Sequence, residues 1–308
     1  MNGGIPLEVW GQAATAGVLA GLAATAVTVL IERCGGLVGG VIGTTPSTIL
    51  AAAMGIAAGA ANASDLQIAL FTVPMAMACD VLLLAAWKVV PPFLPQGSSV
   101  GAKAAMLSLV SLVVWAIPAG GVWALTSLVL REAFQVVIAG TVTLVVTAIA
   151  GLAWTWQLPP SPPGSNHVGW KVLVTRGLGA GLSIFAAVLV ARVSPALGGL
   201  VSAFPAIFLT TMVSVFLAQG EATTTGAVGP MILGSTSVSL FACVFAALAP
   251  GTSHWAALGS AYVIAIAGAS VPATLWLRWR RSKATTGFEE VVEPAAQEDE
   301  GAVDGQSA

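Results

Sequence analysis

The sequence contains very few charged residues. Asp, Glu, Lys and Arg make up 8% of its 308 residues, whereas a soluble domain carries about 25%. Seven of the 13 acids lie between residues 289 and 304, so the rest of the chain is almost uncharged. Hydrophobic residues make up 57% of the chain, and its mean hydropathy is +0.93. Because a soluble protein needs polar side chains to cover its surface, this composition excludes a soluble globular protein and predicts an integral membrane protein.

Histidine and cysteine, which carry much of metal and redox chemistry, are also scarce. The two His residues have no Cys or His neighbours at the spacing of a metal site. Cys34, Cys79 and Cys243 fit no zinc or redox motif, and their apolar surroundings are typical of small buried hydrophobes. The sequence also lacks an H-E-x-x-H motif, a P-loop and a Rossmann fingerprint. We therefore predict no enzyme activity, no cofactor, no bound metal and no nucleic-acid partner.

Apolar runs long enough to cross a bilayer, which takes about 20 residues, occupy most of the chain. We expect nine of them, at residues 10–31, 35–61, 66–90, 104–130, 134–156, 172–193, 196–218, 226–249 and 255–277. None alternates with a period of two, so they predict helices rather than the strands of a barrel. The predicted fold class is an all-α polytopic membrane protein with about nine transmembrane helices.

The runs and the polar segments between them suggest a domain organisation. It comprises a short N-terminal segment (1–9), a first membrane repeat (10–131), a connecting transmembrane helix (132–157), a polar loop (158–170), a second membrane repeat (171–278) and a tail (279–308). The tail is polar, acidic and poor in aromatics, and we expect it to be disordered.

The distribution of Lys and Arg predicts the orientation in the membrane. With nine helices, one side receives Arg33, Lys88, Lys103, Lys171, Arg176, Arg278, Arg280, Arg281 and Lys283. The other side receives only Arg131 and Arg192. Because cytoplasmic loops carry the excess of Lys and Arg, we place the C-terminus in the cytoplasm and the N-terminus outside. The sequence does not identify which membrane holds the protein.

The two halves of the chain contain a repeat. Residues 39–50 and 198–209 align without a gap, and further matches flank them. The informative pairs are Gly17/Gly177, Gly21/Gly181, Gly39/Gly198, Gly40/Gly199, Pro46/Pro205, Leu50/Leu209 and Pro74-Met75/Pro230-Met231. Coincidence in a chain rich in Gly, Ala and Leu is the alternative explanation. If the repeat is real, the connecting helix makes the second unit enter from the opposite side, which gives the inverted repeats found in many transporters.

Two predicted helices, at 35–61 and 196–218, combine a Gly-rich stretch with one mid-run proline. Proline is tolerated at the first turn of a helix but not in its interior, so we expect Pro46 and Pro205 to start half-helices at the membrane midplane. Thr44 or Thr45 would cap the first half-helix, and the free N–H groups would favour an anion. The predicted substrate site contains Thr44, Thr45, Pro46, Ser47, Ser202, Phe204, Pro205 and Thr210. The alternative is two ordinary proline kinks, with the glycines serving helix packing.

One acid, Asp80, lies deep inside an apolar run. A charge at that depth costs at least about 2.5 kcal/mol, so we predict a coupling role for it, as a proton carrier or cation ligand. The repeat places Thr236 opposite Asp80, beside Ser235. A neutral Asp that hydrogen-bonds neighbouring helices is the alternative. Arg176, one turn into the sixth run, is expected to snorkel to the cytoplasmic face, with an anion in the cavity as its alternative partner.

The stretch GGLVSAFPAIFLTTM, at residues 198–212, resembles the small GlpM-like membrane proteins. These carry a similar Gly-Leu-x(3)-Phe-Pro element after their first helix. The first half departs from this pattern, because Thr44-Thr45-Pro46 stands where the second half has Ala203-Phe204-Pro205. The resemblance implies that the chain is a tandem fusion of two such units. It indicates an architecture and does not identify a substrate.

The leading functional hypothesis is a secondary transporter for a small anionic solute, with alternating access through inverted repeats and proton coupling through Asp80. A channel or uniporter is the second hypothesis. A non-transporting membrane scaffold or assembly factor that acts through its tail is the third. The expected partners are the solute, a coupling ion and the lipid bilayer, and a homodimer is an open alternative.

Overall fold

The computed structural model describes residues 6–34, 45–130, 132–156 and 169–283, without the side chains of residues 31–34. Every regular element in these ranges is a helix. The prediction of an all-α fold is therefore confirmed for the part of the chain that the structure describes.

The first half contains helices α1 (Leu7–Cys34), α3 (Ile49–Ala57), α4 (Ala63–Val89), α5 (Val100–Ala124) and α6 (Ala133–Trp154). A short 3₁₀ turn (Pro91–Phe93) follows α4, and a π turn (Leu125–Val129) extends α5. Polar caps define where these helices begin. The Asn62 side chain accepts the Asp65 N–H at 2.9 Å, and Ser99 accepts the Ala102 N–H at 3.2 Å. Each cap satisfies a backbone donor that the helix itself leaves free.

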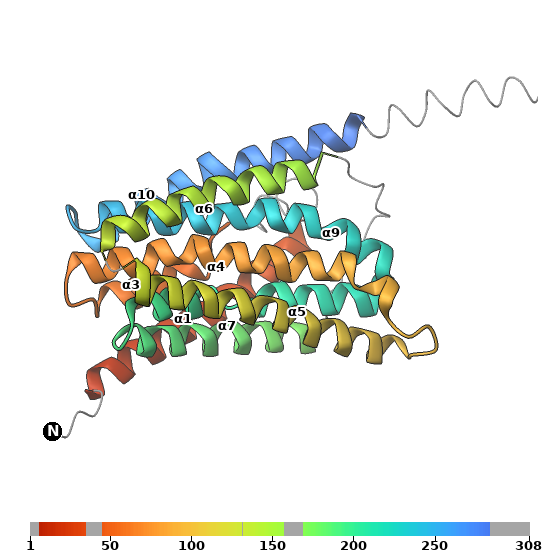
Figure 1. The fold of residues 1–308 in the computed structure, drawn as a ribbon, viewed down its shortest axis with the longest axis horizontal. Helices are drawn as coiled ribbons and strands as arrows, with labels where there is room; N and C mark the ends of the chain where they lie inside the picture. The colour runs from red at the N-terminus through yellow and green to blue at the C-terminus, as the bar shows by residue number, and fades with distance from the viewer. Residues whose placement is uncertain (1–5, 35–44, 131, 157–168, 284–308) are drawn as a thin grey trace, which may run out of the picture.

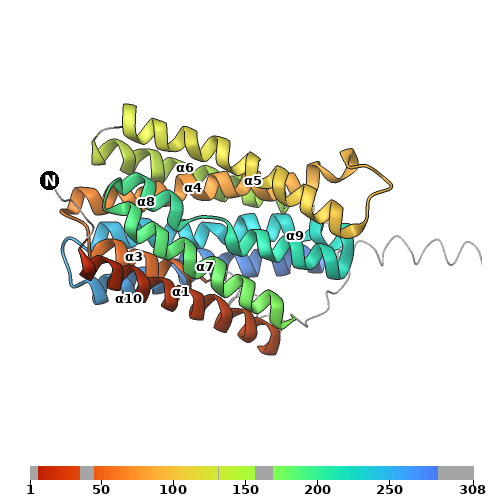
Figure 2. The ribbon, with the colours of Figure 1, turned by 90° about the horizontal axis from the view of Figure 1, so that it is seen from below.

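The second half contains α7 (Trp170–Ala191), α8 (Pro195–Ser202), α9 (Ala206–Leu248) and α10 (His254–Ala265), which a π turn (Ile266–Ser270) extends. Helix α9 is divided at Gly220, where φ is 81° and ψ is −175°. Residues other than glycine rarely adopt this backbone conformation. It lets the limbs 206–219 and 221–248 fold back and run side by side (Figures 1 and 2).

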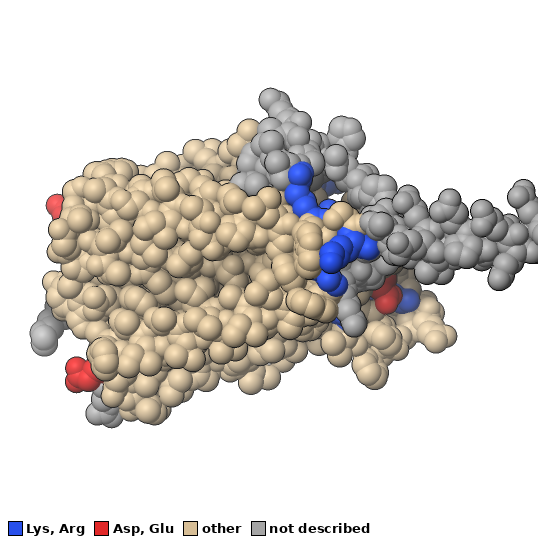
Figure 3. All heavy atoms as spheres, turned by 90° about the horizontal axis from the view of Figure 1, so that it is seen from above, with Lys and Arg blue, Asp and Glu red and all other residues tan. Residues whose placement is uncertain are grey.

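The helices run along the long axis of one bundle (Figure 1). Helix α4 and the 221–248 limb lie at its centre, and both contribute apolar side chains to each of two buried clusters. The outer helices expose large apolar side chains, with Ile117 72% and Leu182 66% exposed. Apolar surface on this scale is unstable in water, and it is what a lipid-facing surface requires. In the view of Figure 3, the visible Lys, Arg, Asp and Glu side chains lie at the two ends of the bundle.

Seven helical segments in the described ranges are long and apolar enough to cross a membrane. One of them, Pro195–Leu248, has 54 residues and as a straight helix would be about 81 Å long at 1.5 Å per residue. A bilayer core is about 30 Å thick, so the breaks before Ala206 and at Gly220 are needed to fit it. With this fold-back, the described chain has seven or eight long apolar helices. The polytopic membrane protein predicted from the sequence is confirmed at this level.

The predicted count of nine depends on the run at residues 35–61, which the structure describes only in part. Residues 35–44 lie outside the described ranges, and α3 has nine residues. At 1.5 Å per residue α3 is about 14 Å long, too short to cross a bilayer alone. The other predicted runs correspond to helices, for example 66–90 to Ala63–Val89 and 134–156 to Ala133–Trp154.

Candidate functional site

A break in the helical backbone lies between α8 and α9. Helix α8 ends at Ser202, and Pro205 is the N-cap of α9, with φ −76° and ψ 33°. Pro205 is close to the middle of the stretch 195–219, which Figure 2 shows crossing the bundle. The first regular hydrogen bond of the 206–219 limb is donated by the Leu209 N–H to the Pro205 carbonyl, at 2.8 Å. The N–H groups of Ile207 and Phe208 come before this bond, in the positions where a helix start leaves backbone donors without an intrahelical acceptor.

The predicted hydroxyl residues at this break bond to their own helices. Ser202 Oγ donates to the Gly199 carbonyl at 2.7 Å, so this side chain closes α8 and does not cap α9. Thr210 Oγ1 donates to the Ala206 carbonyl at 2.7 Å. Phe204 is 39% exposed, and its ring packs in a T-shaped arrangement with Trp115, with the ring centroids 5.3 Å apart.

The corresponding segment in the first half is built differently from the prediction. Helix α3 begins at Ile49, and its N-cap is Thr48, whose side chain makes no capping hydrogen bond. The Ser47 N–H donates to the Thr45 carbonyl at 2.8 Å, so a tight turn separates Pro46 from the helix. The expectation that Pro46 occupies the first helical turn is therefore wrong, because this turn intervenes. Thr44 lies outside the described residues.

The glycines around the second break serve close packing. A Cβ at Gly199 would lie 1.9 Å from the Ala69 carbonyl oxygen of α4, and a Cβ at Gly198 would lie 2.3 Å from the Ala191 Cβ. Helix α8 can therefore approach α4 and α7 only because these side chains are absent. Gly198 and Gly199 therefore serve helix packing, which was the alternative explanation of the Gly-rich stretch. Their lack of side chains lets α8 lie against the centre of the bundle.

Asp80 is completely buried in the middle of α4. Within the described part of the chain, neither of its carboxyl oxygens has a hydrogen-bond partner. The indole N–H of Trp115, on α5, neighbours this carboxyl without reaching hydrogen-bond geometry. Since Trp115 also packs against Phe204, it links the buried acid to the helix break.

Ser235 and Thr236 lie at the level of Asp80. Residues before Asp80 on α4 share a buried cluster with Phe241 and Ala242, and residues after it share one with Val228 and Ile232. Because the 221–248 limb runs antiparallel to α4 (Figure 1), residues 235–239 lie between these levels. The hydroxyls of Ser235 and Thr236 are buried and bond to their own helix, Ser235 Oγ to the Ile232 carbonyl and Thr236 Oγ1 to the Leu233 carbonyl.

Arg176 is buried, with 8% of its surface exposed. Nη1 donates to Thr28 Oγ1 on α1 at 3.1 Å, and Nη2 donates to Thr211 Oγ1 on α9 at 2.6 Å. Nε has no partner among the described residues. The expectation that Arg176 snorkels to the surface is therefore wrong, because two threonines from neighbouring helices hold its guanidinium inside the bundle.

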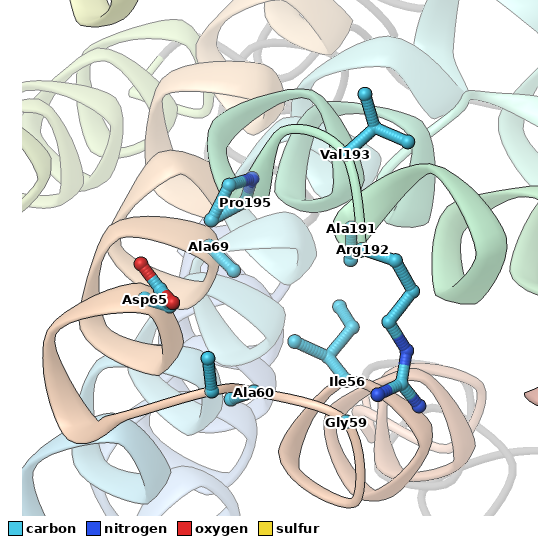
Figure 4. A pocket seen from close by; sticks show the side chains of 10 residues that line it. Ile56, Gly59, Ala60, Asp65, Ala69, Ala191, Arg192, Val193 and Pro195 are labelled. Carbon is cyan, nitrogen blue, oxygen red and sulfur yellow. The ribbon is translucent and has the colours of Figure 1, made fainter. Parts of the chain in front are cut away.

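A cavity opens at the end of the bundle where α1 begins, between the α3–α4 and α7–α8 connections (Figure 4). Its volume is about 260 Å³, slightly below the usual range for ligand pockets. Asp65 and Arg192 line opposite walls (Figure 4). Arg192 Nη2 donates to Gln12 Oε1 at 2.7 Å, while Asp65 accepts from Asn62 Nδ2 at 3.1 Å. The two charged side chains therefore lie on opposite walls, and each hydrogen-bonds to a neighbour on its own side of the cavity.

Sequence reasoning missed Trp115. Most tryptophans of this chain lie near the ends of apolar runs, as interfacial residues do, whereas Trp115 lies in the middle of the 104–130 run. That position was the available signal. Its contacts with Phe204 and Asp80 depend on how three helices pack together.

No protein-family model, no curated protein and no solved structure matches this chain. The resemblance to GlpM-like proteins stays a prediction, and function has to be inferred from the geometry of the chain itself.

Proposed function

We propose that this chain is a secondary transporter for a small anionic solute. It would consist of two inverted four-helix repeats joined by α6, and it would work by alternating access. The observation that carries the proposal is the contact between α1 and α7, the most extensive contact between two helices of the described chain.

Four glycines form the crossing of α1 and α7. A Cβ at Gly17 would lie 2.7 Å from the Gly181 carbonyl oxygen, and one at Gly21 would lie 2.7 Å from the Gly177 carbonyl oxygen. The repeat alignment pairs Gly17 with Gly177 and Gly21 with Gly181. When each glycine is mapped onto its counterpart in the other repeat, the contact between Gly17 and Gly181 becomes the contact between Gly177 and Gly21. A two-fold axis between the repeats would produce such reciprocal contacts, which supports the proposal.

The direction of the two helices supports an axis in the membrane plane. Arg192, at the end of α7, bonds to Gln12 near the start of α1. Arg176, near the start of α7, bonds to Thr28 near the end of α1. The helices are therefore antiparallel, so a two-fold axis that exchanges them inverts one unit relative to the other.

Charged residues at the two ends of the bundle add to this support. Asp65 aligns with Glu221 in the register that pairs Pro74 with Pro230. Arg192 aligns with Arg33 in the register that pairs Gly198 with Gly39. Asp65 and Arg192 line the cavity of Figure 4. Their sequence counterparts belong to the ends of helices at the opposite end of the bundle. Two ends with matching residues are what alternating access through inverted repeats requires.

Electrostatics favours an anion as the solute. The start of the 206–219 limb lies near mid-depth, and helix starts carry a partial positive charge and free N–H groups. Arg176 adds a full positive charge inside the bundle. Asp80, buried and without a hydrogen bond among the described residues, is suited to carry a proton, which would compensate the charge of the anion during transport.

Orientation follows from the distribution of basic residues. Lys88 ends α4, Lys103 and Lys171 begin α5 and α7, and residues 278–283 end the last helix. Figure 3 shows the Lys and Arg side chains gathered at this end of the bundle. We predict that this end is cytoplasmic. A C-terminal green fluorescent protein fusion should fluoresce, whereas a C-terminal alkaline phosphatase fusion should be inactive. An active phosphatase fusion would reverse the orientation.

Uptake into proteoliposomes tests the function directly. We expect purified protein to accumulate at least one labelled small anion when a pH gradient is imposed, and protein-free liposomes to show no accumulation. Downhill flux that no pH gradient can drive uphill would favour the channel or uniporter. Absence of flux for anions, cations and neutral solutes alike would favour the scaffold, in which case deletion of residues 284–308 should abolish the function.

A further inference from the structure

The guanidinium of Arg176 occupies an unusual environment for a charge inside a membrane protein. Together with Asp80, it is one of two buried charged side chains in the described part of the chain. Its partners there are two threonine hydroxyls, Thr28 Oγ1 at 3.1 Å and Thr211 Oγ1 at 2.6 Å. These hydroxyls donate in turn to the carbonyls of Ala24 and Ile207. The pair of threonines therefore fixes the orientation of the guanidinium without neutralising it.

Such an arrangement is costly unless an anion completes it. A buried charge is normally paired with an opposite charge, because transferring it from water without a partner costs several kcal/mol. No carboxylate among the described residues pairs with Arg176, and its Nε–H is buried without an acceptor. The unpartnered Nε–H and the second N–H of Nη2 lie on adjacent nitrogens of a guanidinium whose position is fixed, and together they give two donors. This fork matches two oxygens of one oxyanion.

The location of Arg176 connects it to the broken helix. Thr211 is the sixth residue of the limb that starts at Ala206, directly after Thr210 of the predicted substrate site. Thr28 belongs to α1, which crosses α7 at the four glycines. The guanidinium therefore contacts helices from both proposed repeats, on the side of the break that faces the basic end of the bundle.

We propose that Arg176, oriented by Thr28 and Thr211, binds the oxyanion group of the transported solute through its Nε–H edge. This rests on the proposed function, and it narrows the substrate class to solutes with a carboxylate or a tetrahedral oxyanion. A monatomic anion offers one acceptor atom to two parallel donors, whereas an oxyanion offers one oxygen to each, so the monatomic anion should bind much more weakly. In the repeat, Arg176 aligns with Ala16, so the site belongs to the second unit alone and the two repeats differ in function.

Binding to the purified full-length protein in detergent tests the proposal without requiring transport. The probes are sodium acetate, sodium sulfate and sodium chloride at matched ionic strength, and the readout is the thermal unfolding temperature over a concentration series. We expect acetate or sulfate to raise this temperature saturably in the wild type, and chloride to leave it unchanged. Sulfate also stabilises proteins non-specifically, so saturation of the effect is the criterion.

Arg176→Gln should abolish the saturable shift, and Arg176→Lys, which keeps the charge but loses the fork, should weaken the apparent affinity at least tenfold. Arg278→Gln is the matched control, because Arg278 is exposed near the end of the last helix; we expect it to bind like the wild type. Should Arg176→Gln fail to fold, Thr211→Val, which removes the hydroxyl that orients Nη2, should still weaken binding several-fold.

Three outcomes would overturn the proposal. The first is a saturable shift that persists unchanged in Arg176→Gln and Thr211→Val. The second is the absence of any saturable shift in the wild type. The third concerns Glu32, which follows Thr28 by one helical turn in α1: if Glu32→Gln destabilises the wild type but not Arg176→Gln, the guanidinium has an internal partner. Transport of a cation or neutral solute without oxyanion binding would refute this site and the anionic substrate, but not a transporter. Oxyanion binding without any flux would refute the transporter, but not this site.

Discussion

Replacement of Asp80 by Asn is expected to reduce gradient-driven uptake at least tenfold, while the protein still folds. Asp80 is completely buried and makes no hydrogen bond among the described residues. Asn has nearly the same shape but cannot take up and release a proton, so a step that needs proton transfer at this position stops. Stability should not fall, because the substitution removes an acid whose charged form is costly to bury.

Glu8→Gln provides the matched control for this experiment. Glu8 is an exposed acid in the first turn of α1, and the same change from acid to amide there should leave coupling to the pH gradient intact. Uptake would be measured in proteoliposomes at equal protein density, with and without the gradient. If uptake by Asp80→Asn equals that of the wild type under both conditions, Asp80 is a structural residue, and a uniporter or channel becomes the better hypothesis.

The positions of the membrane helices could be predicted closely from the sequence. The run at 172–193 became Trp170–Ala191, and the run at 66–90 became Ala63–Val89. The reason is that backbone polar groups inside lipid must bond within their own segment, so a long apolar run has no alternative to a helix. Capping residues such as Asn62 and Ser99 then determine the first residue of each helix.

Side-chain partners between helices were much harder to predict. Hydropathy gives the depth of Arg176 and Trp115 but not the direction in which each side chain points. Arg176 turns inward because Thr28 and Thr211, which lie far from it in sequence, converge on its guanidinium. The start of α3 at Ile49 was also missed, because a proline indicates a helix start nearby without specifying how many turn residues follow it.

Gly21→Leu and Gly181→Leu should each destabilise the protein, by about 1–3 kcal/mol as overpacked sites do. A Cβ at Gly21 would lie 2.7 Å from the Gly177 carbonyl oxygen, and one at Gly181 would lie 3.0 Å from the Gly17 carbonyl oxygen. Both oxygens belong to the backbone and cannot move aside without separating the helices. Gly11→Leu is the control on α1, because a Cβ at Gly11 would have no atom within 4 Å. Thermal unfolding in detergent, followed by size-exclusion chromatography, would measure all three variants.

The comparison of Gly21→Leu with Gly181→Leu also tests the proposed symmetry. The two glycines occupy matching positions in the repeat and make reciprocal contacts, so their substitutions should lower the unfolding temperature by similar amounts. A large effect at one position with none at the other would contradict a two-fold crossing and, with it, the inverted repeat. If the effects are equal, the crossing lies on the axis about which the repeats exchange their arrangements. Its contacts would then persist in both states, and the milder Gly21→Ala should slow turnover without altering which solutes are bound.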